Sequence, residues 1–267
     1  MEPRAPSEED VLVGPGHGEM ITDRENREVA LIAVRDDITM TRSRYGPGER
    51  GPDPHVHHEH TDSFYVLNGE LTFALGPGSE RVMVPAGGFV AVPPNVSHSF
   101  RNEGSADAHF LNFHTPDGGF AAFMRGARDG ADIGFDSFDP PADGGRPASE
   151  AIVVGPDEGE RVEAGNRVAE VKAVLPHICF VEYAYDGPRE GPPVHDHDDQ
   201  VDSFYVLDGE IEFEVGGSVH PGGLGTLASI PRGVRHTFRH IHDGRARVLN
   251  IHAPDCGFGE FIRGTED

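Results

Sequence analysis

The feature that most constrains this chain is a long internal repeat. Residues 51–76 and residues 191–216 align without a gap and are identical at 14 of 26 positions. The similarity continues from PPNVSHSFRN to PRGVRHTFRH and from LNFHTPDGGFAAFMRG to LNIHAPDCGFGEFIRG. Solenoid units repeat every 20–50 residues or so, and the offset here is near 140. The sequence therefore predicts a duplicated domain.

Each copy has the composition of β-structure. Short runs such as SFYVL, FVAV and HFLNFH are rich in aromatic and β-branched residues, and turn residues separate them. Asn68-Gly69 and Asp208-Gly209 each lie between two such runs. These pairs favour two-residue hairpin turns, because both central residues take positive φ there. Many short strands with Gly and Pro between them indicate a sandwich or a barrel.

The domain organisation follows from the repeat. We predict an all-β chain, with helix confined to short pieces over 119–127 and 257–264. The first barrel is expected over residues 1–126 and the second over 149–267. Residues 127–148 are rich in Asp, Gly and Pro, and they are expected to form the linker.

Both copies carry a set of side chains suited to a metal. Two histidines lie two residues apart, so they face the same way on a strand. A carboxylate follows, and burying it unpaired in an apolar barrel would be costly unless a metal binds it. Three imidazoles and a carboxylate suit Fe(II), Mn(II), Ni(II), Co(II), Cu(II) or Zn(II) and leave positions open. The expected ligands are His55, His57, Asp62 and His98 in the first copy, and His195, His197, Asp202 and His236 in the second.

The same positions carry a family resemblance. The pattern resembles the two-part cupin motif, Gly-x5-His-x-His-x(3,4)-Glu-x6-Gly followed by Gly-x5-Pro-x-Gly-x2-His-x3-Asn. The whole chain is similar to bacterial two-domain cupins of the quercetin-dioxygenase-like group. The resemblance implies two jelly-roll barrels, each with one divalent metal ion, iron foremost. The matching positions are His55, His57, Gly69, Gly87, Pro93, His98 and Asn102, and then His195, His197, Gly209, Gly225, Pro231, Gly233 and His236.

Two departures from the motif leave alternatives open. Asp62 and Asp202 stand where the motif has Glu, and Asp is shorter by one C–C bond of about 1.5 Å. Each Asp could bind the metal, orient a ligating imidazole, or serve as a general base beside three histidine ligands. His240 replaces the last Asn of the motif, so the surroundings of the two sites differ.

Further histidines lie near these motifs. His114 and His252 each follow an asparagine by two residues. On an inward strand face they would hydrogen-bond or exchange protons near the metal, whereas on the outer face they would tie down the following Pro-Asp turn. The strand is apolar on both faces, so its periodicity does not decide between these alternatives. His58 and His60 have no histidine counterparts in the second copy, and we expect them at the surface or the rim.

The resemblance implies a metal-dependent oxygenase that acts on a small oxygenated or aromatic molecule. The same ion could instead serve an isomerase, lyase or cyclase that does not use O₂. A third alternative is a non-enzymatic protein that binds a small molecule, because a fold alone does not fix a reaction.

Composition excludes some partners. The chain has 46 acidic and 22 basic residues, for a formal charge of −24, which repels nucleic-acid phosphates and anionic membranes. No apolar run approaches the roughly 18 residues of a membrane span. Cys179 and Cys256 are the two cysteines, and they do not occupy repeated positions. We expect a cytoplasmic protein with a small-molecule substrate, and a homodimer stays open.

Overall fold

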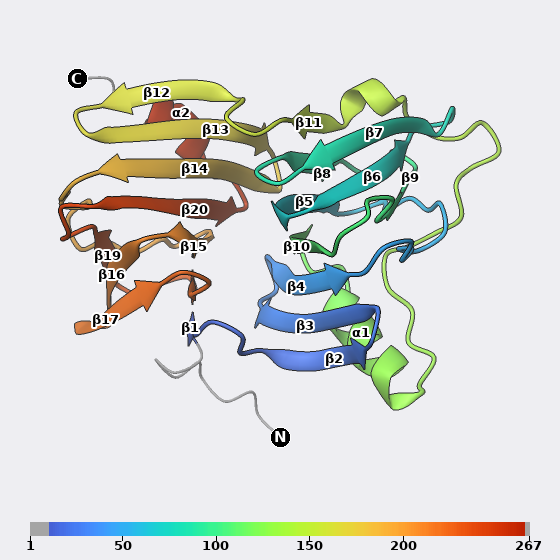
Figure 1. Ribbon diagram of the computed structural model, residues 1–267, viewed down its shortest axis with the longest axis horizontal. Helices are drawn as coiled ribbons and strands as arrows, with labels where there is room; N and C mark the ends of the chain where they lie inside the picture. Colours follow the sequence, from blue (N-terminus) through green and yellow to red (C-terminus); the bar gives the residue numbers. More distant parts are fainter. Residues whose placement is uncertain (1–10, 265–267) are drawn as a thin grey trace. The chain divides into compact units, whose positions relative to one another are not determined.

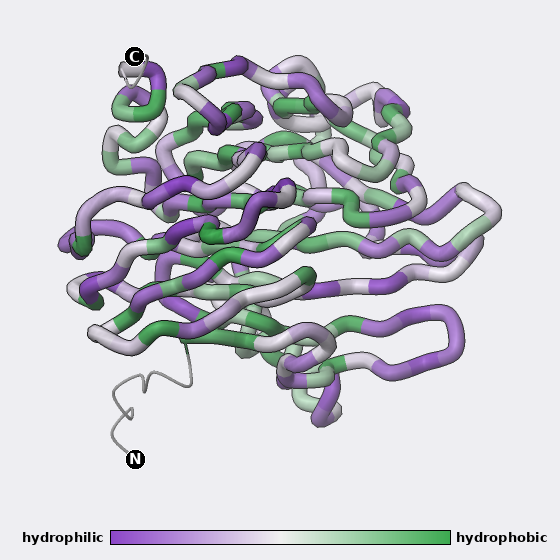
Figure 2. The backbone as a smooth tube through the Cα atoms, turned by 60° about the vertical axis from the view of Figure 1, so that its left-hand side comes forward, coloured by the Kyte–Doolittle hydropathy of each residue, from purple (hydrophilic) through white to green (hydrophobic). Residues whose placement is uncertain are grey.

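The computed structural model describes residues 11–264 and confirms an all-β chain with short helices (Figure 1). Two compact units are present, one spanning Gly18–Glu158 and the other residues 159–264 together with residues 11–17. In both units hydrophobic residues run along the strands, and hydrophilic residues gather in the protruding loops (Figure 2). The duplication inferred from the sequence is therefore a duplication of one β fold.

The N-terminal unit consists of two antiparallel sheets. A seven-stranded sheet has the order β11-β8-β5-β10-β4-β3-β2, and a three-stranded sheet has the order β7-β6-β9. Inward aromatic rings from both sheets form the core, and the Phe64 and Phe73 centroids are 5.0 Å apart. The strands are β2 (Glu19–Arg24), β3 (Arg27–Val34), β4 (Thr39–Tyr45), β5 (Thr61–Asn68), β6 (Glu70–Leu75), β7 (Glu80–Pro85), β8 (Phe89–Val92), β9 (His98–Arg101), β10 (Ala108–Thr115) and β11 (Ile152–Val154).

The C-terminal unit repeats this arrangement. Its sheets have the orders β1-β18-β15-β20-β14-β13-β12 and β17-β16-β19. Phe204 and Phe213 are the core residues equivalent to Phe64 and Phe73, and their ring centroids are 5.6 Å apart. The strands are β1 (Leu12–Val13), β12 (Glu160–Ala164), β13 (Arg167–Leu175), β14 (Ile178–Asp186), β15 (Val201–Asp208), β16 (Glu210–Val215), β17 (Ser218–Gly223), β18 (Leu227–Ile230), β19 (His236–Arg239) and β20 (Arg245–Ala253).

The two units do not follow the boundaries expected from the sequence. β1 comes first in the chain, yet Leu12 pairs with Ala228 on β18 of the C-terminal unit. β11 follows the expected linker, yet Ile152 pairs with Ala91 on β8 of the N-terminal unit. Each short strand covers the edge of a seven-stranded sheet, where unpaired backbone groups would otherwise be exposed. Runs of two or three apolar residues carry no signal that identifies such a partner.

The helices lie where the sequence places them. They are α1 (Phe120–Asp129) and α2 (Phe258–Arg263), and a 3₁₀ turn, η2, covers Ala148–Glu150. The expected linker is part of the N-terminal unit. Phe138 forms a backbone bridge with Val56, and Gly145 forms one with Val96.

The expected hairpins at Asn68-Gly69 and Asp208-Gly209 are wrong. β5 and β6 belong to different sheets, so the chain turns a corner there instead of pairing with itself. Only the glycine has positive φ, 73° at Gly69. A Cβ on Gly69 would lie 2.5 Å from the carbonyl oxygen of Asp107, so the close approach as well as the backbone angle requires glycine.

Candidate metal centre

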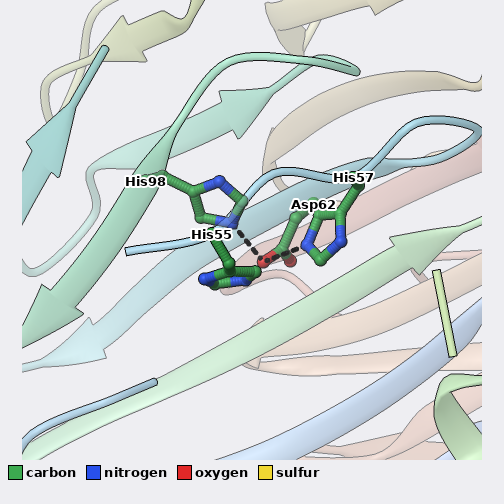
Figure 3. Close-up of side chains that lie close together, drawn as sticks. All are labelled: His55, His57, Asp62 and His98. Carbon is green, nitrogen blue, oxygen red and sulfur yellow. Dashed lines mark hydrogen bonds and ion pairs between the residues drawn. The ribbon is translucent and has the colours of Figure 1, made fainter. Parts of the chain in front are cut away.

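The four expected ligands of the first barrel come together. His55, His57, Asp62 and His98 are buried, and one ligand atom from each lies within 4.8 Å of the others. Asp62 comes from β5 and His98 begins β9, and an antiparallel bridge fixes His55 beside His98. The rings of His57 and His98 point at the Asp62 carboxylate, and His55 lies next to them (Figure 3).

Hydrogen bonds set the direction in which the three imidazoles offer their lone pairs. The Nδ1 atoms of the three rings lie near carbonyl oxygens: His55 is 2.9 Å from Asp53, His57 is 2.5 Å from Asp136, and His98 is 3.2 Å from Val96. A carbonyl oxygen can only accept, so each Nδ1 carries the proton and each Nε2 has a free lone pair. This is the tautomer that metal-binding histidines adopt when a carbonyl orients them.

Of the two distances between donor atoms, one fits a bound divalent metal and the other is slightly longer. Asp62 Oδ2 lies 3.2 Å from His98 Nε2 and 3.8 Å from His57 Nε2. With metal–nitrogen distances of about 2.0–2.1 Å, neighbouring ligand atoms lie roughly 3.0–3.4 Å apart. His57 Nε2 is buried and has no hydrogen-bond partner. A bound cation would satisfy this atom. The Asp62 carboxylate, although one bond shorter than Glu, lies beside the same imidazole nitrogens.

Burial keeps the site in the protonation state that a metal needs. It lowers the pKa of His55 to about 3, and the neighbouring His98 and His57 add to this effect. Burial alone would raise the pKa of Asp62, but the nearby imidazoles of His114, His57 and His98 hold it well below its usual value. At neutral pH the site therefore offers neutral His55 and an ionised Asp62.

His114 lies on the inward face of β10. Its Nε2 is 3.6 Å from Asp62 Oδ1, which also accepts a 2.5 Å hydrogen bond from the Asn112 amide. The Phe120 ring stacks on the imidazole, with centroids 3.6 Å apart. Of the two alternatives for this strand, the structure shows the inward one. Asn112 and His114 hold the carboxylate oxygen that faces away from His98.

The prediction that His60 lies at the surface or rim is wrong, whereas His58 is exposed as expected. His60 is fully buried, with Nδ1 2.8 Å from Asp136 Oδ2 and Nε2 2.9 Å from His114 Nδ1. Burial lowers the pKa of His60 to about 4. His57, His60 and His114 also lie close enough to share an ion. The contact between His60 and His114 is a hydrogen bond, so these rings form a network beside the site.

Asp136 is the residue that sequence reasoning missed. It lies in the expected linker, and its carboxylate accepts hydrogen bonds from the backbone N–H groups of His58 (2.9 Å) and Glu59 (2.8 Å). Its backbone carbonyl holds His57, and its side chain holds His60. A single Asp in an Asp-rich segment carries no signal for this role. The contact requires a segment 79 residues away to fold back over the site.

The second barrel assembles the equivalent set, His195, His197, Asp202 and His236. Asp202 Oδ2 lies 3.2 Å from His236 Nε2 and 3.6 Å from His197 Nε2, which again is buried without a hydrogen-bond partner. The Asn250 amide donates to Asp202 Oδ1 at 2.5 Å. Burial alone would lower the pKa of His236, but the neighbouring Asp202 carboxylate raises it.

The surroundings of the second set differ from those of the first. Gln200 replaces His60, and with its amide oriented to satisfy both ends, its oxygen accepts from His197 Nδ1 (3.1 Å) and His252 Nδ1 (2.7 Å). His252 faces inward, 3.3 Å from Asp202, and burial lowers its pKa to about 4. His240 is a structural residue, because both its ring nitrogens lie within 2.9 Å of backbone carbonyls.

Each set of histidines opens into a cavity within its own unit. The first has a volume of about 660 Å³ and the second about 810 Å³. Volumes of this order hold small organic ligands. Aromatic rings line both: Tyr45, Phe100, Phe110, Phe120, Phe123 and Phe135 in the first, and Tyr183, Tyr185, Phe238, Phe258 and Phe261 in the second.

Comparison with known families decides the classification. Residues 41–114 and again residues 184–252 match the family described as "Cupin domain". The chain belongs to the cupin family. The two matches cover both histidine sets, so this cupin has two domains of the same family.

One curated relative matches part of this two-domain cupin. It is 33% identical over 98 residues to quercetin 2,3-dioxygenase of Bacillus subtilis, a match that covers 36% of this chain and 27% of that protein. The matched segment is thus little more than a quarter of the relative's length.

Solved structures show the same fold at low identity. AerE from Microcystis aeruginosa has a TM-score of 0.63 at 13% identity, covering 91% of this chain and 99% of that one. Oxalate decarboxylase from Bacillus subtilis has a TM-score of 0.64 at 14% identity, covering 92% and 76%. Within residues 11–264, no helix is long and apolar enough to cross a membrane.

Proposed function

We propose that this cupin is a metal-dependent oxygenase that acts on a small oxygenated, partly aromatic molecule. One observation carries the proposal: three imidazoles and a carboxylate converge in each barrel, and members of each set line an aromatic cavity. The similarity to quercetin 2,3-dioxygenase over 98 residues supports it. Of the metals that suit such donors we propose iron, with one ion in each barrel.

The residues of the chain have distinct tasks in this proposal. His55, His57 and His98 would hold the ion together with Asp62, and the ion would supply open positions for a substrate oxygen and O₂. Asn112 holds Asp62 Oδ1 at 2.5 Å and so fixes the carboxylate. An ionised Asp62 can also accept the proton of a substrate hydroxyl that enters the cavity.

The corresponding residues of the second barrel would do the same. His195, His197, His236 and Asp202 would hold the ion, with Asn250 fixing the carboxylate. His252 lies 3.3 Å from Asp202 and is neutral at neutral pH, so it can share a proton with a substrate group near the carboxylate.

Oxygen consumption by the purified protein tests the proposal. We expect O₂ uptake with at least one member of a panel of flavonols, catechols and enols, and its loss in the double variant His57→Ala/His197→Ala. His242→Ala is the matched control, because this histidine is half exposed and pairs with Glu210 outside both sites.

Two other outcomes would replace the proposal. Substrate conversion that is equal under air and under nitrogen would identify an isomerase, lyase or cyclase that uses the ion without O₂. Binding of panel members without any conversion would indicate a non-enzymatic small-molecule-binding protein.

A further inference from the structure

The two cavities differ in charge at the end away from the histidines. In the second barrel Tyr185 pairs with Ala246 on β20, six residues before His252. At 3.4 Å per residue this end lies roughly 20 Å along the strand from the level of the metal set. The corresponding position of the first barrel is Tyr45, opposite Ala108 on β10. Each cavity reaches from the histidines to these tyrosines.

At this end of the first cavity the charges cancel. The guanidinium carbon of Arg27 lies 4.6 Å above the centre of the Tyr45 ring. An Arg27 nitrogen forms an ion pair with Glu49 at 2.8 Å. Asp23 and Arg24 also line this cavity and offset one another. An incoming anion would have to compete with Glu49 for the Arg27 guanidinium.

The second cavity keeps the arginine and replaces the glutamate. Arg167 begins β13 as Arg27 begins β3, and its guanidinium carbon lies 5.3 Å above the Tyr183 ring. The residue equivalent to Glu49 is Arg189. Its carbonyl accepts a hydrogen bond from the His240 backbone at 3.0 Å, as Glu49 accepts one from the Asn102 backbone at 2.9 Å.

Arg189 is held by neutral groups. Its Nη1 donates to the carbonyl oxygen of Ala164 at 2.7 Å and to Asn166 Oδ1 at 3.2 Å. Over residues 11–264, no carboxylate lies within ion-pair distance of Arg189. Burial raises the pKa of Tyr185, and the charges of Arg167 and Arg189 both oppose this rise. The two guanidinium groups therefore act on the same phenol.

Three other charged groups line the second cavity. Glu190 also lines the cavity but is exposed. Arg239 is already paired with Glu212, and Asp202 lies with the histidines. Arg189 thus places a positive charge at the end of this cavity where the first barrel has the negative charge of Glu49, in a chain whose formal charge is −24.

We propose that the second cavity binds an aromatic carboxylate, with its anionic group on Arg167 and Arg189 and its ring directed toward the histidines. Guanidinium groups bind carboxylates through two parallel hydrogen bonds, and the rings of Tyr185 and Phe238 give the aromatic part an apolar wall. The inference rests on the proposed function only in taking this cavity as the substrate site. The first cavity, with Glu49 on its arginine, does not select anions.

Calorimetric titration of the metal-loaded protein with trans-cinnamate and with the neutral, equally shaped trans-cinnamamide tests the inference. We expect cinnamate to bind one site at least tenfold more tightly than cinnamamide, and 0.5 M salt to reduce that preference. Arg189→Glu restores the charge arrangement of the first barrel and should abolish the preference. Glu49→Arg should create a second cinnamate site.

The controls separate this charge effect from others. Arg161→Glu makes the same change of charge at an exposed position that pairs with Glu163, and it should leave cinnamate binding unchanged. If Arg189→Glu does not fold, Arg189→Gln removes the charge and keeps a donor for the Ala164 carbonyl. Equal affinities for cinnamate and cinnamamide in the wild type, or a preference that survives the loss of Arg189, would overturn the inference. These binding measurements do not depend on O₂ uptake. The inference and the proposed function can therefore fail independently of one another.

Discussion

The two histidine sets have the same ligands but are held in different ways. In the first barrel the middle histidine, His57, is oriented by a backbone carbonyl from Asp136, 79 residues away. In the second barrel the middle histidine, His197, is oriented by the side chain of Gln200, three residues away. The duplication has kept the ligand positions while the groups that orient them diverged. The same set of candidate ligands therefore occurs twice in one chain with different supports.

The same difference changes how open the sites are. The side chain of His57 is 1% exposed and that of His197 is 20% exposed. The segment that carries Asp136 also places Phe135 against His57, with centroids 5.9 Å apart. In the second barrel the His197 ring is oriented by the side chain of Gln200, and it stays partly exposed. We therefore expect the first site to be the slower one in exchanging its metal.

The largest expected effect is on metal content, when a ligand is removed from one barrel at a time. His57→Ala and His197→Ala should each lower the metal content by about one equivalent, because each removes a ligand that no neighbour replaces. Elemental analysis of protein purified without chelator measures this, with His242→Ala as the control. If His57→Ala alone lowered the content, the second barrel would hold no ion.

The ligand set is the part of the site that sequence could predict. Histidines two apart face the same way on any extended strand, so the pairs at His55 and His195 follow from spacing alone. The third histidine, His98 or His236, recurs on a later strand of each copy. Motif matching could not decide the role of Asp62. In the structure its Oδ2 lies 3.2 Å from His98 Nε2, and the Asn112 amide donates to its Oδ1.

What sequence could not predict depends on contacts between distant segments. His60 follows His57 by three residues in an irregular turn, where no period tells which way a side chain points. Its burial depends on Asp136, which arrives from the expected linker. The strand pairings of β1 and β11 could not be predicted either, because strands of two or three residues carry no sequence signal for their partner strand. The all-β class and the duplication, in contrast, depend on patterns that repeat along the whole chain.

The second prediction concerns acid. In the folded state the pKa of His55 is about 3 and that of His60 about 4, against roughly 6.5 when unfolded. Between these values the unfolded chain binds more protons, so their contribution to stability is complete above pH 6.5 and is lost as the pH falls toward 4. For buried His60 the loss amounts to about 3 kcal/mol by pH 4. In the second barrel the pKa of His252, about 4, causes a similar loss, and the raised pKa of His236 opposes it.

Exchanging His60 of the first barrel and Gln200 of the second tests this loss of stability in acid. Urea unfolding of the chelator-treated protein at pH 7.5 and pH 5 should show a smaller drop in the free energy of unfolding for His60→Gln than for the wild type. The reciprocal change, Gln200→His, should increase the drop. Equal drops in all three proteins would contradict the assignment to His60.

A smaller effect is expected from the groups that orient the middle histidines. Asp136→Ala should weaken metal binding 10–100-fold at the first site only, because it frees His60 and the turn that follows His57. Gln200→Ala should do the same at the second site only. Competition with a fluorescent chelator measures both affinities, and Asp136→Asn, which keeps the shape of the side chain, should retain part of the affinity. If either Ala variant weakened both sites equally, the two supports would not be independent.

The smallest effect concerns the strand that joins the C-terminal unit from the start of the chain. Val11 is 3% exposed in the core of that unit, and its carbonyl accepts a hydrogen bond from the Ser229 backbone at 2.8 Å. Val11→Ala should lower the free energy of unfolding by about 1–2 kcal/mol, since two buried methyl groups are lost. Val153→Ala on β11 is the matched control, because Val153 is 40% exposed and its loss should cost less than about 0.5 kcal/mol. Hydrogen exchange should place the loss of protection from Val11→Ala in β18 and β15, although the substituted residue precedes the whole N-terminal barrel in the sequence. Loss of protection in β8 and β5 instead would show that β1 supports the barrel it precedes, and the unit boundaries would then follow the order of the chain.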